Sequence, residues 1–289
     1  MNNMTDWKSS IELKAPCWAG YRSFLEALPG GAFPGIASLE KLLPPRTSSG
    51  NGSAIRFVPA DDLPGVDYER HIFETGQVST RENSWHDLFN ALVWCRLPEL
   101  KIAMNSLHYD HLDQAQGSGR GRLRDALTLL DESGVIVSGP GIDTLNALAR
   151  RDWKTAFITH RESWGRELQV LICGHAILEK FLDPYKSVTA HALLLHTPGL
   201  LSVEEIDRTI GSALAGPGWL TSPARLSPLP LMGIPGWWRE CDQGAEFYRD
   251  HHVFRPFPAD RSPAHVHFHA EISPSPDPEH IENLALTPK

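Results

Sequence analysis

The chain has 289 residues, of which 41% are hydrophobic and 21% are charged, and its formal net charge is −8 with histidine counted as neutral. This composition is typical of a globular protein with a sizeable core. An acidic chain lacks the diffuse positive field that attracts nucleic-acid phosphates, so we expect a small-molecule or protein partner rather than nucleic acid. The basic run Arg120, Arg122 and Arg124 lies in a Gly-rich stretch that is typical of a solvated loop.

Signals for membranes and for secretion are missing from the sequence. No stretch approaches the roughly 18 apolar residues of a membrane helix, and residues 1–16 lack the apolar segment of a secretory signal. We therefore expect a cytoplasmic protein that is not associated with a membrane. The four cysteines are widely spaced, which argues against Cys-rich zinc sites and against a disulfide framework.

One globular domain is expected over residues 19–256, after a loosely held lead over 1–18 and before a Pro- and His-rich, flexible tail over 257–289. Proline and glycine mark the ends of the first elements. Two short helices are expected over Trp18–Leu28 and Ile36–Leu43, because Pro-Gly-Gly and Pro-Pro stop them. The β-branched and aromatic residues that follow predict strands over Ile55–Val58 and Tyr68–Val78.

Helical periodicity dominates the rest of the chain. The helices that it predicts are Trp85–Arg96, Glu99–His108, Ile142–Ala149, Arg166–Leu182 and Glu204–Ala213. Two apolar runs in Leu123–Ser138 flank a turn-forming segment and indicate a β-hairpin, and Val188–Leu195 is a further strand. Residues 217–256 are rich in Pro and Trp and are expected to wrap over the core as ordered coil. The signals show no βαβ rhythm, so the predicted class is α+β, mostly helical, with a small antiparallel sheet or hairpins.

The helix predicted over Trp85–Arg96 carries short polar residues where a surface helix would carry Lys and Glu. The polar residues are His86, Asp87 and Asn90. Buried polar groups must be paired, because an unpaired one costs about 1–3 kcal/mol. Two interpretations remain open. Either these three residues line a cleft as catalytic groups, or Asp87 caps the helix while His86 and Asn90 bond neighbouring backbone.

The helix predicted over Arg166–Leu182 places His175 and Glu179 one turn apart within an apolar stripe. A His and a Glu at this spacing can chelate one cation, and they can equally form a buried hydrogen-bonded pair. His108, at the end of the helix predicted over Glu99–His108, can complete a ligand set. We therefore expect one divalent metal ion held by His175, Glu179 and His108.

Weaker candidates have ordinary structural explanations. Turn chemistry accounts for Asp131 and Glu132 at the predicted hairpin, and His191 is an ordinary strand residue. The alternating residues His265, His267 and His269 lie on one face of a strand, where metal binding would be incidental. Motifs for phosphate loops, dinucleotide binding and nucleophile elbows are not found.

Several long motifs resemble one bacterial family, the domain of unknown function numbered 3025. In this chain the motifs are FETGQV at 73–78, NSWHDLFNALVW at 83–94, RDALTLLDESG at 124–134, GHAILEK at 174–180 and PLP at 228–230. The likeness extends over roughly Tyr21 to Pro256. The family pattern has an aromatic residue where this chain has Cys173. No activity is attached to the family, so the resemblance implies no function.

Two functions follow from these residues. The first is a metal-assisted hydrolase, in which the metal lowers the pKa of a bound water, Asp87 or Glu179 acts as ligand or base, and Asn90 orients the substrate. The alternative is a non-catalytic binding or assembly protein, with a satisfied polar core and an interface over residues 217–256. A cleft that contains both His86 and His175 favours the enzyme, whereas separated or sealed histidines favour the alternative.

Overall fold

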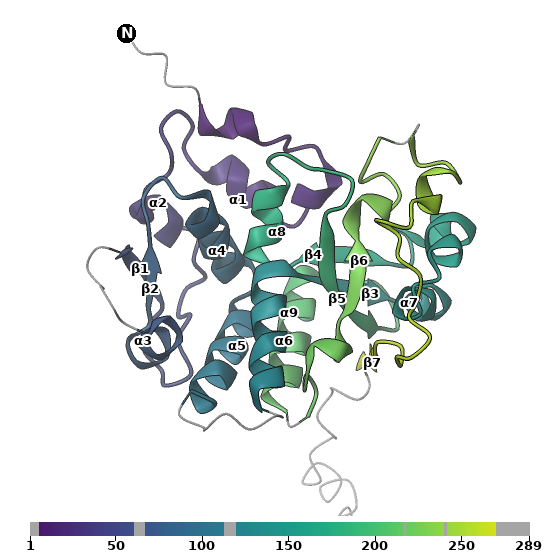
Figure 1. The fold of residues 1–289 in the computed structure, drawn as a ribbon. Coiled ribbons are helices and arrows are strands. Elements are labelled where there is room, and N and C mark those ends of the chain that lie inside the picture. The colour runs from purple at the N-terminus through teal and green to yellow at the C-terminus, as the bar shows by residue number, and fades with distance from the viewer. Residues whose placement is uncertain (1–5, 61–66, 113–119, 217, 240–241, 270–289) are drawn as a thin grey trace, which may run out of the picture.

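A mixed five-stranded sheet occupies one side of the molecule, and helices with a small two-stranded sheet occupy the other (Figure 1). The computed structural model describes residues 6–60, 67–112, 120–216, 218–239 and 242–269. The predicted α+β class is confirmed. The larger sheet is mixed rather than antiparallel, because β3 pairs with β5 in parallel.

Two helices, Trp85–Arg96 and Ile142–Ala149, have the predicted bounds. The α-helices are α1 (Arg22–Ala27), α2 (Ile36–Glu40), α3 (Tyr68–Thr75), α4 (Trp85–Arg96), α5 (Pro98–Asp110), α6 (Arg120–Ser133), α7 (Ile142–Ala149), α8 (His175–Lys180) and α9 (Val203–Ala215). Short 3₁₀ helices and one π-helical turn lie at Trp7–Ser10, Pro16–Trp18, Thr155–Thr159, Arg161–Ser163, Pro223–Arg225, Leu231–Gly233 and Phe247–Arg249. The side chain of Ser84 caps α4, and Ser202 with Glu205 forms a capping box at α9.

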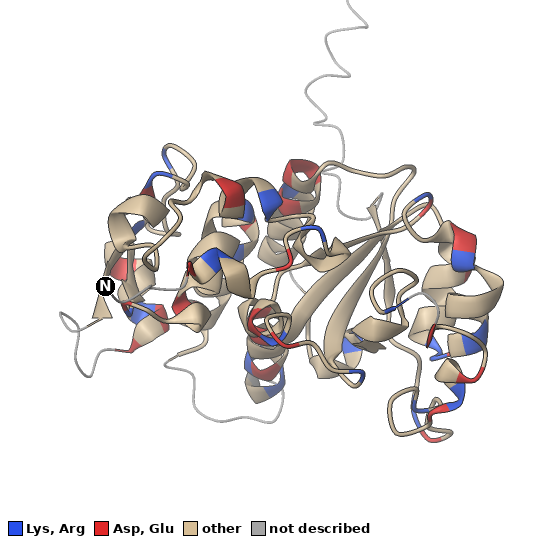
Figure 2. Cartoon of the chain, turned by 90° about the horizontal axis from the view of Figure 1, so that it is seen from above, with Lys and Arg blue, Asp and Glu red and all other residues tan. Residues whose placement is uncertain are grey.

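The strands are β1 (Arg56–Pro59), β2 (Gln77–Thr80), β3 (Gly134–Gly139), β4 (Gln169–Ile172), β5 (Thr189–His196), β6 (Ser227–Pro230) and β7 (Val266–Phe268). Strands β1 and β2 form a parallel pair. The larger sheet has the order β4-β3-β5-β6, and β7 pairs with the end of β5 beyond β6. These five strands contain no Lys, Arg, Asp or Glu, so they are drawn in tan in Figure 2.

One hydrophobic core runs through both sides of the molecule and includes Trp18, Phe89 and Leu193. Trp18 stacks on Phe89 with ring centroids 5.6 Å apart. The residues expected to form a loosely held lead differ from that expectation over 6–18, since Trp7 and Trp18 are buried. Large aromatic side chains explain the difference, because the free energy gained by burying them exceeds the conformational entropy lost when the segment is ordered. Within the described residues, every helix is too short or too polar to cross a membrane.

The strand predicted over Tyr68–Val78 is wrong, because most of that segment forms α3. The side chain of Asp67 accepts a hydrogen bond from the backbone nitrogen of Arg70, which caps the helix start. Gly76 ends the helix with a positive φ of 72°. A glycine within the predicted strand is therefore a helix C-cap, and the strand β2 begins after it.

Two further predictions fail in segments that lie against each other. The hairpin predicted over Leu123–Ser138 is α6 followed directly by β3, and the helix predicted over Arg166–Leu182 is β4 followed by α8. Where the two segments meet, the backbone nitrogen of Gly174 donates to the carbonyl of Gly134 over 2.8 Å. A Cβ atom on Gly174 would lie 2.3 Å from the nitrogen of Gly134. This close approach places the start of α8 beside the end of α6.

The C-terminal segments are more regular than expected. Residues 217–256 contribute β6 and contain no α-helix among those that are described, as predicted. The tail was expected to be flexible or laid on the surface, but its residues 266–268 form β7, and His267 is buried. Residues 270–289 lie outside the described part of the chain. Pairing of β7 with an open edge of β5 explains why this segment is ordered, because it satisfies hydrogen-bonding groups of the β5 backbone. The sequence pattern alone does not reveal that this edge is open.

Candidate functional site

A pocket of about 500 Å³ lies among α3, α4, α5, α6 and α8, and we call it the histidine cleft. Its lining residues are mostly polar or titratable. They are Ala60, Tyr68, Glu69, Ser79, Arg81, His86, Asp87, Asn90, His108, Arg124, Thr128, Asp131, Glu132 and His175. Five of the six predicted site residues therefore line one pocket. The sixth, Glu179, contacts His86 from α8.

Two histidines face each other in this cleft. The Nε2 atoms of His86 and His175 are 2.9 Å apart, and the two rings are nearly perpendicular. On its other side, Nδ1 of His86 lies 3.3 Å from Oε2 of Glu179. Nδ1 of His175 lies 3.8 Å from Oδ2 of Asp131, a separation for ion pairing rather than for a hydrogen bond. The order Glu179, His86, His175, Asp131 thus leads from the surface to the interior.

The two imidazoles differ in exposure. The side chain of His86 is 40% exposed and lies beside Glu179, and the contact between the two Nε2 atoms needs one proton between them. Burial lowers the pKa of His175 to about 4, so this imidazole stays neutral.

Asp131 is the centre of a buried network that holds the inner histidine. The ammonium group of Lys101 donates to Asp131 and, over 3.0 Å, to the side-chain oxygen of Asn90. The amide nitrogen of Asn90 donates to the hydroxyl of Tyr68 over 2.8 Å. Burial alone would raise the pKa of Asp131, but the positive charge of Lys101 holds it below its ordinary value. Asp131 therefore remains an anion beside His175.

Asp87 forms an ion pair with Arg81 at the rim of the cleft. Its two carboxylate oxygens accept hydrogen bonds from the guanidinium of Arg81, and the backbone nitrogen of Arg81 donates to one of them over 2.6 Å. Burial would raise the pKa of Asp87, but these hydrogen bonds keep it lowered. Its backbone nitrogen donates to the Oγ of Ser84, so Asp87 belongs to the cap of α4.

Glu69 on α3 is a carboxyl group of the cleft whose pKa is shifted in the direction opposite to that of Asp131. Burial raises the pKa of Glu69 to about 7, and the negative charge of Asp131 adds to this effect. The side-chain nitrogen of Asn105 donates to Glu69 over 2.7 Å. One carboxyl group that stays ionised and another that titrates near neutrality are the combination that acid–base chemistry uses.

The three expected metal ligands do not form one site. Glu179 and His175 contact opposite nitrogens of His86, so the His86 ring lies between them. Burial lowers the pKa of His108 to about 4, and this residue lines the cleft from α5. Across the described residues, no three His, Cys, Asp or Glu side chains are placed to hold one metal ion.

Lys101, Glu69 and Tyr68 were not anticipated from the sequence, and Asp131 was assigned to a turn. A signal for Lys101 is present in the sequence of α5. Lys101, Asn105 and His108 recur at the spacing of one helix face, and all three are buried. A polar stripe on a buried face indicates a site as clearly as the pattern in α4 does.

A family model described as "Protein of unknown function (DUF3025)" matches residues 55–257. The chain belongs to this family. The DUF3025 match starts later than the resemblance expected from Tyr21, and it includes every residue of the histidine cleft. No curated protein and no solved structure matches the chain.

Proposed function

We propose that this DUF3025 protein is a hydrolase in which His86 and His175 act as a general acid–base pair. The observation that carries the proposal is the 2.9 Å contact between their Nε2 atoms inside an open cleft, with Glu179 and Asp131 at the two outer nitrogens. A carboxylate that faces Nδ1 favours the tautomer whose Nε2 atom carries a lone pair, and without substrate the lone pair of His175 faces Nε2 of His86.

The proposed step uses both histidines. Nε2 of His175 accepts a proton from a water molecule whose oxygen attacks the scissile bond of the substrate. Nε2 of His86 donates its proton to the leaving group as that bond breaks. The reaction leaves a proton on His175 and removes one from His86. Direct transfer between the two Nε2 atoms then restores the starting state, because no other group separates them.

The charges of the cleft favour an uncharged polar substrate that contains an ester or amide bond. Four carboxyl groups and two arginines line the cleft. Lys101 supplies one further positive charge, and Glu69, whose pKa is raised to about 7, is partly neutral, which brings the cleft close to neutrality. Such a site does not attract a strongly charged substrate.

In a metal-assisted form of the same hydrolysis, His86 and His175 would hold a divalent cation that lowers the pKa of a bound water. Elemental analysis of the purified protein distinguishes the two forms. One divalent metal ion per chain would support the metal-assisted form. Hydrolysis by protein that carries no metal would support the acid–base form.

The alternative of a sealed polar core in a binding protein is less well supported. Sealed groups would be buried throughout, whereas the side chain of His86 is 40% exposed and that of Glu179 is 44% exposed. The histidines lie together in a cleft, which is the arrangement that favours an enzyme.

The test measures hydrolysis of a panel of chromogenic esters and amides by the wild type, by His86→Gln and by His175→Gln. Each variant is expected to lower kcat/KM by about 10²–10⁴-fold while it keeps its near-ultraviolet circular dichroism spectrum. His251→Gln is the matched control, since His251 is exposed outside the cleft. Full activity in both cleft variants would contradict the proposal.

A measurement without substrate tests the same site. Nitrogen NMR of the imidazoles is expected to show a proton in the hydrogen bond between the Nε2 atoms of His86 and His175. Absence of a hydrogen bond between the two rings would contradict the proposed acid–base pair.

A further inference from the structure

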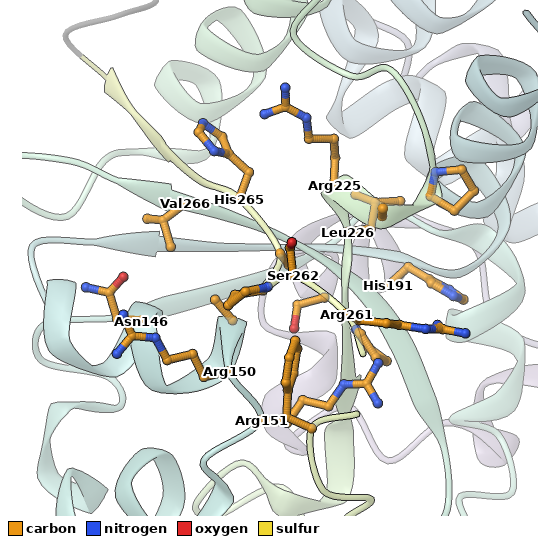
Figure 3. Close-up of a pocket in the computed structure, with 18 of the residues that line it drawn as sticks. Asn146, Arg150, Arg151, His191, Arg225, Leu226, Arg261, Ser262, His265 and Val266 are labelled. Atoms are coloured by element: carbon orange, nitrogen blue, oxygen red, sulfur yellow. The ribbon is translucent and has the colours of Figure 1, made fainter. Parts of the chain in front are cut away.

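A second pocket lies on the sheet side of the molecule, where α7, β5, β6 and the C-terminal segment meet (Figure 3). Its volume is about 880 Å³, and pockets that enclose small organic molecules measure about 300–1,000 Å³. Its walls come from residues 146 and 149–151, 222–228, and 257, 261–266 and 268, with His191 from β5. These segments are far apart in the sequence, so no local motif reveals the pocket.

The lining of this pocket is strongly basic. The titratable residues that line it are Arg150, Arg151, Arg225, Arg261, His191 and His265, and none of its described lining residues is Asp or Glu. We call it the arginine pocket. Its composition is opposite to that of the whole chain, which has a formal net charge of −8.

The four arginines have no acidic partners within the described chain. Arginine ion pairs are formed instead by Arg70, Arg81, Arg96, Arg166 and Arg249. Burial lowers the pKa of the Arg151 guanidinium, and the positive charge of Arg261 lowers it further. Figure 3 shows Arg151, Arg261 and His191 at one side of the pocket, and Arg225 and His265 at the top of the view.

The backbone of Arg151 is strained. α7 ends in a Schellman motif, in which Arg151 donates to the carbonyl of Leu148 and Asp152 donates to that of Ala147. Helices usually place glycine at the left-handed position of this motif, but here Arg151 occupies it with a φ of 52°. Strain of this kind is concentrated at functional sites, and it directs this guanidinium to the pocket.

We propose that the arginine pocket binds a nucleotide that carries at least two phosphate groups. Guanidinium groups bind phosphate oxygens with paired hydrogen bonds, and Arg151 and Arg261, whose positive charges act on each other, match a ligand with more than one negative charge. The guanidinium of Arg151 lies over the ring of Phe257 at 5.8 Å, so an aromatic ring against which a base can pack adjoins the phosphate-binding groups. The concave shape suits a small molecule better than a nucleic-acid duplex.

Isothermal titration calorimetry with ATP, inorganic pyrophosphate and adenosine tests the proposal. ATP is expected to bind more tightly than pyrophosphate or adenosine. Its affinity is expected to fall at high salt, because the attraction between charges contributes most of the binding free energy. The double variant Arg225→Gln, Arg261→Gln is expected to weaken ATP binding by about 100-fold, roughly tenfold for each arginine. Arg166→Gln is the matched control, because Arg166 is 75% exposed and pairs with Glu162 outside the pocket.

Each other outcome overturns the proposal. Absence of ATP binding at millimolar concentration would rule out the proposal. Unchanged ATP binding in the double variant, with an unchanged Tm, would rule it out as well. Pyrophosphate that binds as tightly as ATP would show a site for simple phosphates. A single-stranded oligonucleotide that binds through the same arginines more tightly than ATP would show a nucleic-acid site. These measurements do not depend on His86 or His175, so they stand apart from the proposed hydrolase.

Discussion

The histidine cleft and the arginine pocket differ in whether their charged side chains have partners of opposite sign. In the cleft, two strong charges have a partner of the other sign, as Lys101 has Asp131 and as Asp87 has Arg81. In the arginine pocket, four like charges line one cavity without such partners among the described residues. The cleft is therefore complete as folded, and its ionisable groups are prepared for proton transfer. The pocket is incomplete electrostatically, which is the property of a binding site for an anion.

The largest expected effect is the removal of a paired charge from the cleft. The side chain of Lys101 is 5% exposed and bonds both Asp131 and Asn90. Lys101→Met should destabilise the fold by about 3–5 kcal/mol in urea denaturation, because it leaves a buried carboxylate unpaired. Adding Asp131→Asn should recover part of this loss. Arg261→Gln, in the other region, should change the free energy of unfolding by less than about 0.5 kcal/mol. Equal losses for the two single variants would erase the contrast.

A smaller effect depends on pH and sharpens the comparison within the cleft. The pKa of Glu69 rises from 4.5 to about 7 on folding, so the folded protein keeps a proton that the unfolded chain loses across that window. Glu69 therefore makes the wild type less stable as pH rises from 4.5 to 7. His175, whose pKa falls from 6.5 to about 4, acts in the opposite direction between pH 4 and 6.5.

Glu69→Gln should accordingly gain stability relative to the wild type as pH rises from 4.5 to 7, by about 1–3 kcal/mol over the window. Urea denaturation at a series of pH values measures the difference. Glu82→Gln, at an exposed position, serves as the control. A difference that stays constant with pH would show that Glu69 titrates as an ordinary surface carboxyl group.

The smallest effect is expected at the strained residue of the arginine pocket. Arg151→Gly should raise the free energy of unfolding by about 1 kcal/mol, since glycine adopts a positive φ without steric cost. The same variant should weaken ATP binding. Stability and affinity that move in opposite directions would identify a residue kept for its ligand, whereas a loss of both would indicate a structural role.

The sequence predicted those parts of the fold that local chemistry determines. Trp85–Arg96 and Ile142–Ala149 are helices with the predicted bounds, and Ser202 with Glu205 caps α9. The failures lie where one signal has two meanings. Gly76 was placed inside a predicted strand although it ends a helix, and Gly134 was assigned to a turn although it starts a strand against Gly174.

The site was predictable only as far as single helices reveal it. His86 and His175 came from unusual polar positions within apolar segments, and the structure brings them together. Asp131 belongs to the site through contacts between helices, which no spacing along the chain expresses. The arginine pocket is the extreme case, because residues from 150 to 261 meet only after folding.

The close approach of Gly134 and Gly174 limits how this protein can be engineered. Even a methyl group at position 174 forces two backbone segments apart, and those segments carry Asp131 and His175. Libraries that seek new substrate preferences should keep both glycines and vary Thr128 and Glu132, which are exposed and line the same cleft. Selectivity can then change while the reacting groups keep their positions.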